Sequence, residues 1–320
     1  MKTTGIIRRP GAIGIMMIVL ALMLGHIVPA QAQYDPTYNQ YMFNEFFINP
    51  AVAGSKNALN ISGLTRQQWM GIKGSPNIYA LCAHTPLAND KIGLGIGMTH
   101  YTVGTNQISV GYFDFAYRIH LSRGTLALGL QGSVGYHDPR YHLLEYVDIQ
   151  DPALLNAEKG VVFNTGFGVY YYTDKFYLGF SIPRMLNNDY ITGINERFDI
   201  SDWTYYIQGG YVYDVNPDFS IMPSAMLKLT GGAAPQYNIS LMGLAWSTLW
   251  LGADLRTDFQ ADNTLAAIAG IQIAKSLRVT YSYDFNLSST YRSWLGGTHE
   301  ISLSYTLDYW NKRVVSPRLF

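Results

Sequence analysis

The sequence predicts an all-β fold, a closed transmembrane antiparallel β-barrel of about fourteen strands with an aromatic segment ahead of the first strand. Three observations predict it. Segments of about ten residues carry apolar side chains at every second position, an export signal precedes them, and the connections between them alternate between short and long. A soluble β-sandwich would show the same alternation, but it has no reason to sort its connections by length.

The first thirty-two residues, 1–32, have the features of a cleavable signal peptide. Arg8 and Arg9 precede an apolar run over 12–28, and Ala30-Gln31-Ala32 fits the small-x-small cleavage rule. We therefore expect the mature chain to begin near Gln33. The alternative, a retained membrane anchor, is disfavoured because proline and glycine interrupt the run. No later stretch is apolar enough for a transmembrane helix, so only a closed barrel could place this chain in a membrane.

Residues 33–56 form an aromatic segment that is too apolar for a solvated linker. Full burial of an aromatic side chain is worth roughly 1.5 to 3 kcal/mol, so these side chains need a surface to pack against. We expect the segment to dock inside or beneath the barrel through Tyr41, Phe43, Phe46 and Phe47. Asn49 and Pro50 are expected to make the turn into the first strand, because a residue before proline avoids the helical region.

The barrel is expected to occupy residues 57–307. Alternation and turn signals place its strands near 58–66, 77–84, 92–100, 107–119, 125–136, 162–172, 176–182, 203–213, 219–228, 236–246, 249–256, 264–273, 277–285 and 298–307. Within 107–119 the apolar side chains change from even-numbered to odd-numbered positions. This change of strand face predicts a β-bulge near Tyr112. Pro223 removes a backbone donor from its strand and predicts either a rim position or a local distortion there.

The connections divide into two classes. Short turns are expected at 121–124, 173–175, 216–218, 247–248 and 274–276, whereas long loops are expected at 137–161, 183–202 and 286–297. If both termini lie in the periplasm, the short turns are periplasmic and the long loops face outside. This arrangement is typical of outer-membrane barrels.

Composition agrees with a barrel and excludes some partners. Charged residues make up 14% of the chain, against about a quarter in soluble proteins, while the chain has 25 Tyr and 31 Gly. Tyrosine fits the aromatic girdles at the membrane interfaces, and glycine fits a crowded lumen wall. The formal net charge of zero gives no indication of a nucleic-acid partner, and the single cysteine, Cys82, excludes an internal disulfide.

If the apolar parity faces lipid, the opposite parity lines the lumen. That face carries both acidic and basic residues: Asp114, Arg118, Asp254, Arg256, Arg278, Asp284 and Glu300. Charges that cannot face lipid pair with one another inside, so we interpret this lumen charge network as a brace across a narrow barrel. The alternative is a path for ions or a substrate.

No combination of residues predicts an enzyme, a metal site or a bound cofactor. The histidines outside the signal lack the spacing of a zinc site; they are His84, His100, His120, His137, His142 and His299. An outer-membrane hydrolase could use His84 or His299 at a barrel rim, but it would need a Ser or Asp within hydrogen-bond reach, and no nucleophile elbow is present.

Several short motifs resemble one known family. They are Gln40-Tyr41-Met42-Phe43-Asn44, Ile48-Asn49-Pro50-Ala51-Val52-Ala53-Gly54-Ser55, Arg66-Gln67-Gln68-Trp69, His84-Thr85-Pro86-Leu87, Asp114-Phe115-Ala116-Tyr117-Arg118 and His299-Glu300-Ile301-Ser302-Leu303-Ser304. In this order they resemble the PorP/SprF membrane proteins of the type IX secretion system of Bacteroidota. The resemblance implies an outer-membrane barrel that works with other type IX components and supports secretion or surface attachment of one large adhesin or exoprotein.

The tail, 308–320, departs from the family. Members often end in a basic run followed by Cys-Pro and a terminal Phe, whereas this chain has Ser316 before Pro317. The basic residues could meet an acidic partner surface or anionic lipid headgroups. The resulting hypothesis is a non-enzymatic secretion component of the cell outer membrane with periplasmic termini. The alternative is a channel for small solutes or hydrophobic ligands, which would need an open lumen.

Overall fold

A computed structural model describes residues 37–87, 90–140, 159–189, 193–197, 203–259, 263–274, 276–287 and 296–307. The expected signal peptide 1–32, its cleavage site and the basic tail 308–320 lie outside the described residues. The described chain forms a closed antiparallel barrel of 14 strands, which confirms the predicted fold class. No helix in the described part of the chain is long and apolar enough to cross a membrane.

The strands lie close to the expected ranges. They are β1 (Leu59–Gln67), β2 (Asn77–Leu87), β3 (Ile92–Val103), β4 (Asn106–Leu121), β5 (Gly124–Pro139), β6 (Gly160–Tyr172), β7 (Phe176–Ile182), β10 (Thr204–Tyr211), β11 (Tyr213–Asn216), β12 (Phe219–Thr230), β13 (Gln236–Ala245), β14 (Leu249–Thr257), β15 (Asn263–Ile273), β16 (Leu277–Asn286) and β17 (Thr298–Leu307). The strands β10 and β11 are two parts of one barrel strand, because both pair with β12. A small separate hairpin consists of β8 (Asn187–Asp189) and β9 (Gly193–Arg197).

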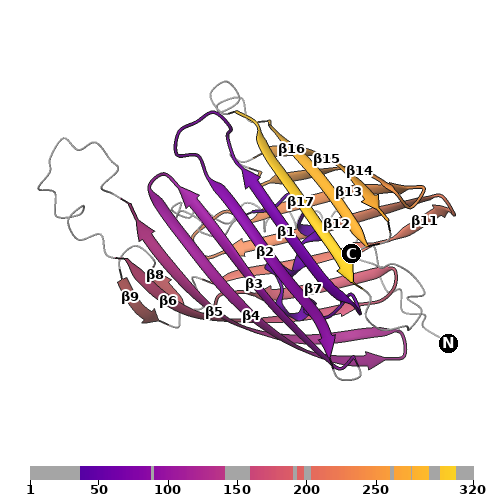
Figure 1. Ribbon diagram of the computed structural model, residues 1–320, viewed down its shortest axis with the longest axis horizontal. Helices are drawn as coiled ribbons and strands as arrows, with labels where there is room; N and C mark the ends of the chain where they lie inside the picture. The colour runs from indigo at the N-terminus through magenta and orange to yellow at the C-terminus, as the bar shows by residue number, and fades with distance from the viewer. Residues whose placement is uncertain are drawn as a thin grey trace, which may run out of the picture.

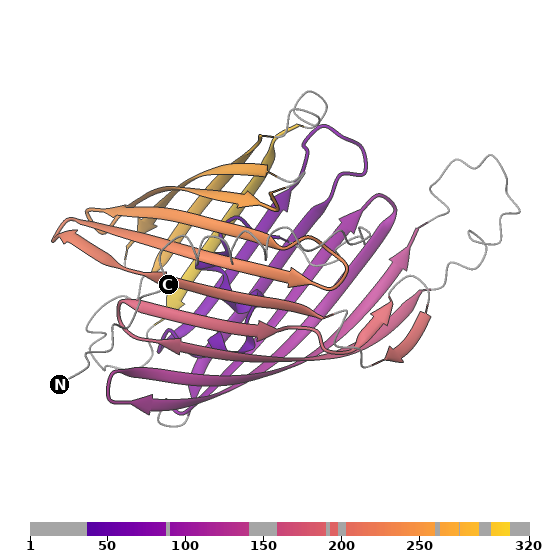
Figure 2. The same cartoon turned by 180° about the vertical axis from the view of Figure 1, so that it is seen from behind.

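Pairing between the first and last strands closes the sheet (Figures 1 and 2). The β1–β17 register runs from Leu59 opposite Leu307 to Gln67 opposite His299. Each remaining strand pairs antiparallel with its neighbour in the sheet. Every strand of the barrel therefore has two neighbours, which removes the exposed sheet edges that a membrane does not tolerate.

The two ends of the barrel carry different connections. We call the end with connections 88–91, 122–123, 173–175, 217–218, 246–248 and 274–276 the turn end. We call the other the long-loop end; it carries 68–76, 104–105, 140–159, 183–203, 231–235, 258–262 and 287–297. The strand β1 begins at the turn end and β17 ends there.

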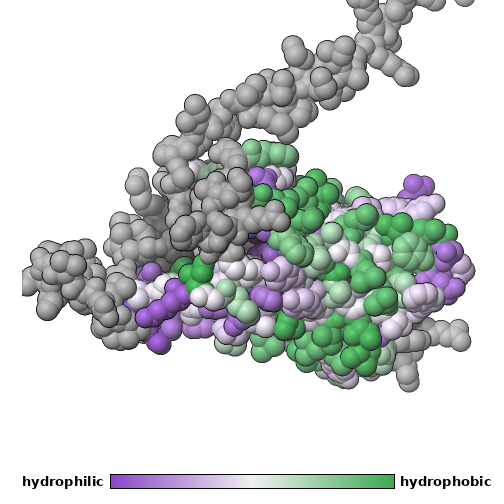
Figure 3. Space-filling model, turned by 90° about the horizontal axis from the view of Figure 1, so that it is seen from above, coloured by the Kyte–Doolittle hydropathy of each residue, from purple (hydrophilic) through white to green (hydrophobic). Residues whose placement is uncertain are grey.

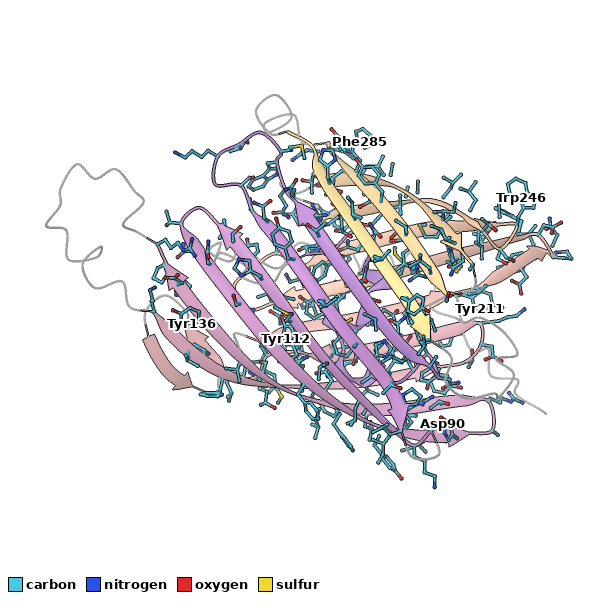
Figure 4. The ribbon with its side chains drawn as sticks, in the orientation of Figure 1. Asp90, Tyr112, Tyr136, Tyr211, Trp246 and Phe285 are labelled. Carbon is cyan, nitrogen blue, oxygen red and sulfur yellow. The ribbon has the colours of Figure 1, made fainter. Side chains whose placement is uncertain are left out.

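Apolar side chains cover the outer surface. Leu94, Leu128 and Tyr281 lie on the outward parity of β3, β5 and β16, and the residues beside them in each strand point inward. Figure 3 shows apolar residues over much of this surface, with polar residues toward both ends of the molecule. Trp246 projects from the β13–β14 turn, and Phe285 lies near the opposite end of the barrel (Figure 4). This surface fits the apolar band of an outer-membrane barrel.

The expected bulge near Tyr112 is wrong. The register between β3 and β4 is uniform from Ile92 opposite Tyr117 to Val103 opposite Asn106. Tyr112 points into the lumen, where its hydroxyl lies 2.6 Å from Thr99 Oγ1. The apolar parity changes in the sequence because the lumen side of β4 is less polar toward the long-loop end, while the backbone continues unbroken.

Pairing is interrupted beside Pro223, but the register is the same on the two sides of the gap. Pairing of β10 with β12 ends at Gly210 opposite Ser224, and pairing of β11 with β12 resumes at Tyr213 opposite Ile221. Pro223 lies in the gap and has no N–H to donate.

Candidate functional site

Residues 37–56, which we call the lumen segment, lie inside the barrel. The segment folds into three short 3-10 helices, η1 (Tyr41–Phe43), η2 (Glu45–Phe47) and η3 (Pro50–Val52). Asn49 is extended and begins η3, where its side chain accepts a hydrogen bond from Ala51 N at 2.9 Å. Residues 53–58 then lead into β1. Asn49 and Pro50 therefore start a helical turn inside the lumen, and the turn into β1 comes later than expected.

Aromatic side chains of the lumen segment pack against the barrel wall. Phe43 meets Trp250 of β14 edge to face at 5.2 Å between ring centroids, and Phe46 stacks on His84 of β2 at 5.4 Å. Tyr41 is fully buried, and its hydroxyl donates to Ser224 Oγ of β12 at 3.2 Å. These contacts bury the large apolar surface that the sequence places ahead of the first strand.

Glycines in the lumen wall make room for the segment. A Cβ atom on Gly93 would overlap the carbonyl of Ala53, and one on Gly129 would overlap the backbone of Ala51. Gly95 of the same wall lies against the ring of Phe46. The inward glycines of β3 and β5 therefore allow direct contact between the segment and the wall, which a larger side chain would prevent.

A buried ion-pair cluster joins the adjacent strands β1, β17 and β16 and extends to β14. Arg66 of β1 lies 2.8 Å from Asp284 of β16 and 2.9 Å from Glu300 of β17, and Arg256 of β14 lies 3.9 Å from Asp284. The side chains of Arg66 and Glu300 are both 0% exposed. Buried charges require such partners, because an unpaired one would keep the full cost of its lost hydration.

The same cluster holds the lumen segment. The carboxylate of Glu300 accepts the backbone N–H of Asn39 and that of Gln40, each at 3.0 Å. The Asn39 side chain also donates to Asp284 and accepts from Arg256 Nη1 at 3.3 Å. The ion pairs therefore fix the wall and the N-terminal part of the segment together, through charge-assisted hydrogen bonds.

The remaining charges of the expected network point inward but form other contacts. Asp254 accepts from Ser240 and from Asn238, and Arg278 lies over the ring of Phe43 at 4.0 Å. Arg118 Nε donates to the Tyr172 hydroxyl at 2.9 Å. Asp114 is buried and has no ion pair among the described residues. The structure thus brings Arg256, Asp284 and Glu300 together, and among the described residues the other four form no ion pair with them.

Arg66 links the cluster, and sequence reasoning did not place it among the lumen charges. It lies inward with Asn60, Ser62 and Leu64 on β1. Leu64 has the polarity of a lipid-facing residue, so the alternation of this strand is weak. Asn60, Ser62 and Arg66 are polar and share one face of the strand, and this pattern could have identified Arg66 as an inward charge.

Glu45 is a buried acid of the lumen segment. It accepts a hydrogen bond from the Tyr170 hydroxyl of β6 at 2.7 Å. Lys56 is half-buried, and burial lowers the pKa of its ammonium to about 8.

The histidine positions offer no metal centre. No group of three or more His, Cys, Asp or Glu among the described residues could hold a metal ion. His84 packs on Phe46 and accepts from Gly54 N at 3.1 Å, while His299 Nδ1 meets the Tyr281 hydroxyl at 2.8 Å. His142 lies outside the described residues.

One serine and histidine pair does occur on the outer surface. His100 Nδ1 lies 2.9 Å from Ser109 Oγ across β3 and β4. Within the described chain, no carboxylate bonds to the other ring nitrogen. The pair therefore lacks the third group that orients a catalytic histidine.

Comparisons with known proteins found one matching family and several similar solved structures. The sequence model of the family described as type IX secretion system membrane protein PorP/SprF matches residues 30–305. No curated protein matches the chain. Among solved structures, the outer membrane protein Omp33 of Acinetobacter baumannii is similar at 7% identity and a TM-score of 0.47, covering 80% of this chain and 100% of Omp33. A KdgM porin is similar at 10% identity and a TM-score of 0.37, covering 77% of this chain and 98% of the porin.

Proposed function

The chain belongs to the PorP/SprF family of type IX secretion system membrane proteins, and from this premise we propose that it receives or anchors one secreted cell-surface protein at the outer membrane. In this proposal the chain is non-enzymatic, its long-loop end faces outside, and its turn end faces other secretion components in the periplasm. The secreted partner binds at the long-loop end.

The lumen segment is the observation that carries the proposal. A solute channel needs an open path, but this lumen contains a segment bonded to strands on several sides. Asn49 Nδ2 donates to Val169 O of β6 at 3.1 Å, and Ser181 Oγ of β7 donates to Ile48 O at 2.8 Å. Gln40 and Tyr41 bond to β17 and β12. A barrel whose lumen segment is bonded to the wall in this way is better suited to bind a partner rigidly than to conduct a solute.

The connection between β1 and β2 supports docking at the long-loop end. Its backbone is fixed at both sides, because Met70 N donates to Gly297 O at 3.0 Å and Gly104 N donates to Gly74 O at 2.8 Å. Trp69, Met70 and Ile72 are nevertheless 37%, 49% and 38% exposed. Large apolar side chains on an ordered loop are typical of a protein interface.

The test compares surface proteins of cells that lack this chain with those of complemented cells. We expect one large protein to disappear from the surface and to return with the wild-type chain. A Trp69→Ser, Met70→Ser, Ile72→Ser variant should assemble as a barrel but fail to restore that protein. Ser109→Ala should restore it fully, because the proposal needs no catalysis.

A different result would overturn the proposal. If every surface protein stays at its normal level without the chain, while uptake of a small solute falls, the chain acts as a channel. The matched variant Trp246→Ser removes an exposed aromatic residue at the turn end, so it controls for a general loss of apolar surface.

A further inference from the structure

Trp246 is the most exposed large apolar side chain that the structure describes, at 70%. It lies with Ser247 at the tip of the β13–β14 hairpin, where Thr248 N donates to Ala245 O at 3.0 Å (Figure 4). Both central residues of this turn have a left-handed backbone, with φ of 52° for Trp246 and 55° for Ser247. Such turns favour Asn and Gly, and a bulky residue is strained there. Neither the backbone nor packing within the described chain accounts for a tryptophan at this tip.

The neighbouring hairpin holds this tip in place. Trp246 N donates to Asp218 O, in the β11–β12 turn, at 2.6 Å, and Thr248 Oγ1 donates to Trp246 O at 3.0 Å. The ring of Phe219, at the start of β12, covers Gly243 of β13, because a Cβ atom added to Gly243 would lie 3.2 Å from it. The ends of the two hairpins therefore form one continuous surface.

This surface carries four large aromatic side chains. We call it the aromatic tip; it consists of Tyr211, Tyr213, Phe219 and Trp246. Tyr213 and Phe219 lie on the outward parity of their strands and are 59% and 37% exposed. The opposite parity is polar, since Asp214 accepts from Ser220 Oγ at 2.7 Å and lies 3.0 Å from Lys175 Nζ. The hairpin thus keeps one apolar and one polar face close to its end.

We infer that the aromatic tip lies in the headgroup region of the bilayer and anchors the turn end of the barrel to lipid. Tryptophan and tyrosine favour this region, because the ring contacts acyl chains while the N–H or O–H reaches headgroups and water. The tip is continuous with the outward face of β14, where Leu249 and Leu251 are exposed in the apolar band. This contact with lipid requires neither a secreted partner nor a particular side of the membrane for the turn end.

Tryptophan fluorescence of the purified chain in phosphatidylcholine vesicles tests this contact, because bromine on a lipid quenches an indole that touches it. The lipid carries bromine near the headgroup, bromine near the bilayer centre, or none. The difference between the wild type and Trp246→Phe gives the emission of Trp246 alone. In the Trp246→Phe chain, Phe219→Trp places an indole on the apolar face of the hairpin. Ser220→Trp places one on the polar face and is the matched control.

We expect bromine near the headgroup to remove most of the emission of Trp246 and of Phe219→Trp, and bromine near the bilayer centre to remove less. Ser220→Trp should keep its emission in both brominated lipids and lose it to acrylamide in the water. If the emission of Trp246 withstands both brominated lipids and falls with acrylamide, the tip lies in water and is left for a protein to cover, which overturns the proposal. Equal quenching of Phe219→Trp and Ser220→Trp by lipid would also contradict it.

Discussion

Arg66 and Glu300 form a buried ion pair of 2.9 Å between the first and last strands of the barrel, and Glu300 also accepts two backbone N–H groups of the lumen segment. Barrel closure and segment docking therefore share one carboxylate.

Substitution of Arg66 or Glu300 alone should be costly, because each change leaves a buried charge without its partner. We expect Arg66→Met or Glu300→Gln to lower the free energy of unfolding by about 3 to 5 kcal/mol. The double variant should cost less than the sum of the two single variants. Urea unfolding in detergent measures all three, and strict additivity would show that the two charges are independently solvated.

Replacement of a glycine by a larger residue should disturb the lumen segment only where the glycine faces the lumen. Gly129→Ala places a methyl group where Ala51 lies, so it should displace the lumen segment. Gly132→Ala on the same strand is the matched control, because a Cβ there meets nothing within 4 Å. Protease cleavage within 37–56 measures the displacement. Equal cleavage rates in the two variants would contradict the observed packing.

Outward positions should reject charge. Leu94→Arg and Leu128→Arg place a guanidinium in the apolar band and should each cost about 2 to 4 kcal/mol of folding stability in a bilayer. Leu128→Ile is the control for a change of shape alone. Refolding into lipid vesicles measures the difference, and full tolerance of both arginines would mean that the strands face the other way.

The fold was predictable because a strand with one lipid face and one lumen face must alternate. Leu277–Asn286 does so clearly, and short turns such as 173–175 separate the strands. Tyr112 misled the sequence reasoning, since an inward tyrosine has the same polarity as an outward one. Alternation along a strand shows which residues share a face. It does not show how polar the lumen face is at each depth of the barrel.

The candidate site was only partly predictable for a related reason. Parity identified Asp284 and Glu300 as inward charges, but their shared partner Arg66 lies more than two hundred positions away, in a weakly alternating strand. Composition likewise indicated that Phe43 and Phe46 need a surface. Their contacts with Trp250 and His84 depend on barrel closure, which no local pattern encodes.

Protease protection of the lumen segment tests the central claim most directly. Outer membranes opened to give access from both sides are treated with a protease of broad specificity, and cleavage sites are mapped by mass spectrometry. We predict that residues 37–56 stay intact as long as the strands do, and that they become cleavable in a Phe43→Ala, Phe46→Ala, Phe47→Ala variant whose barrel still assembles. Rapid cleavage within 37–56 of the wild-type chain, with the barrel intact, would show a mobile linker and contradict the account.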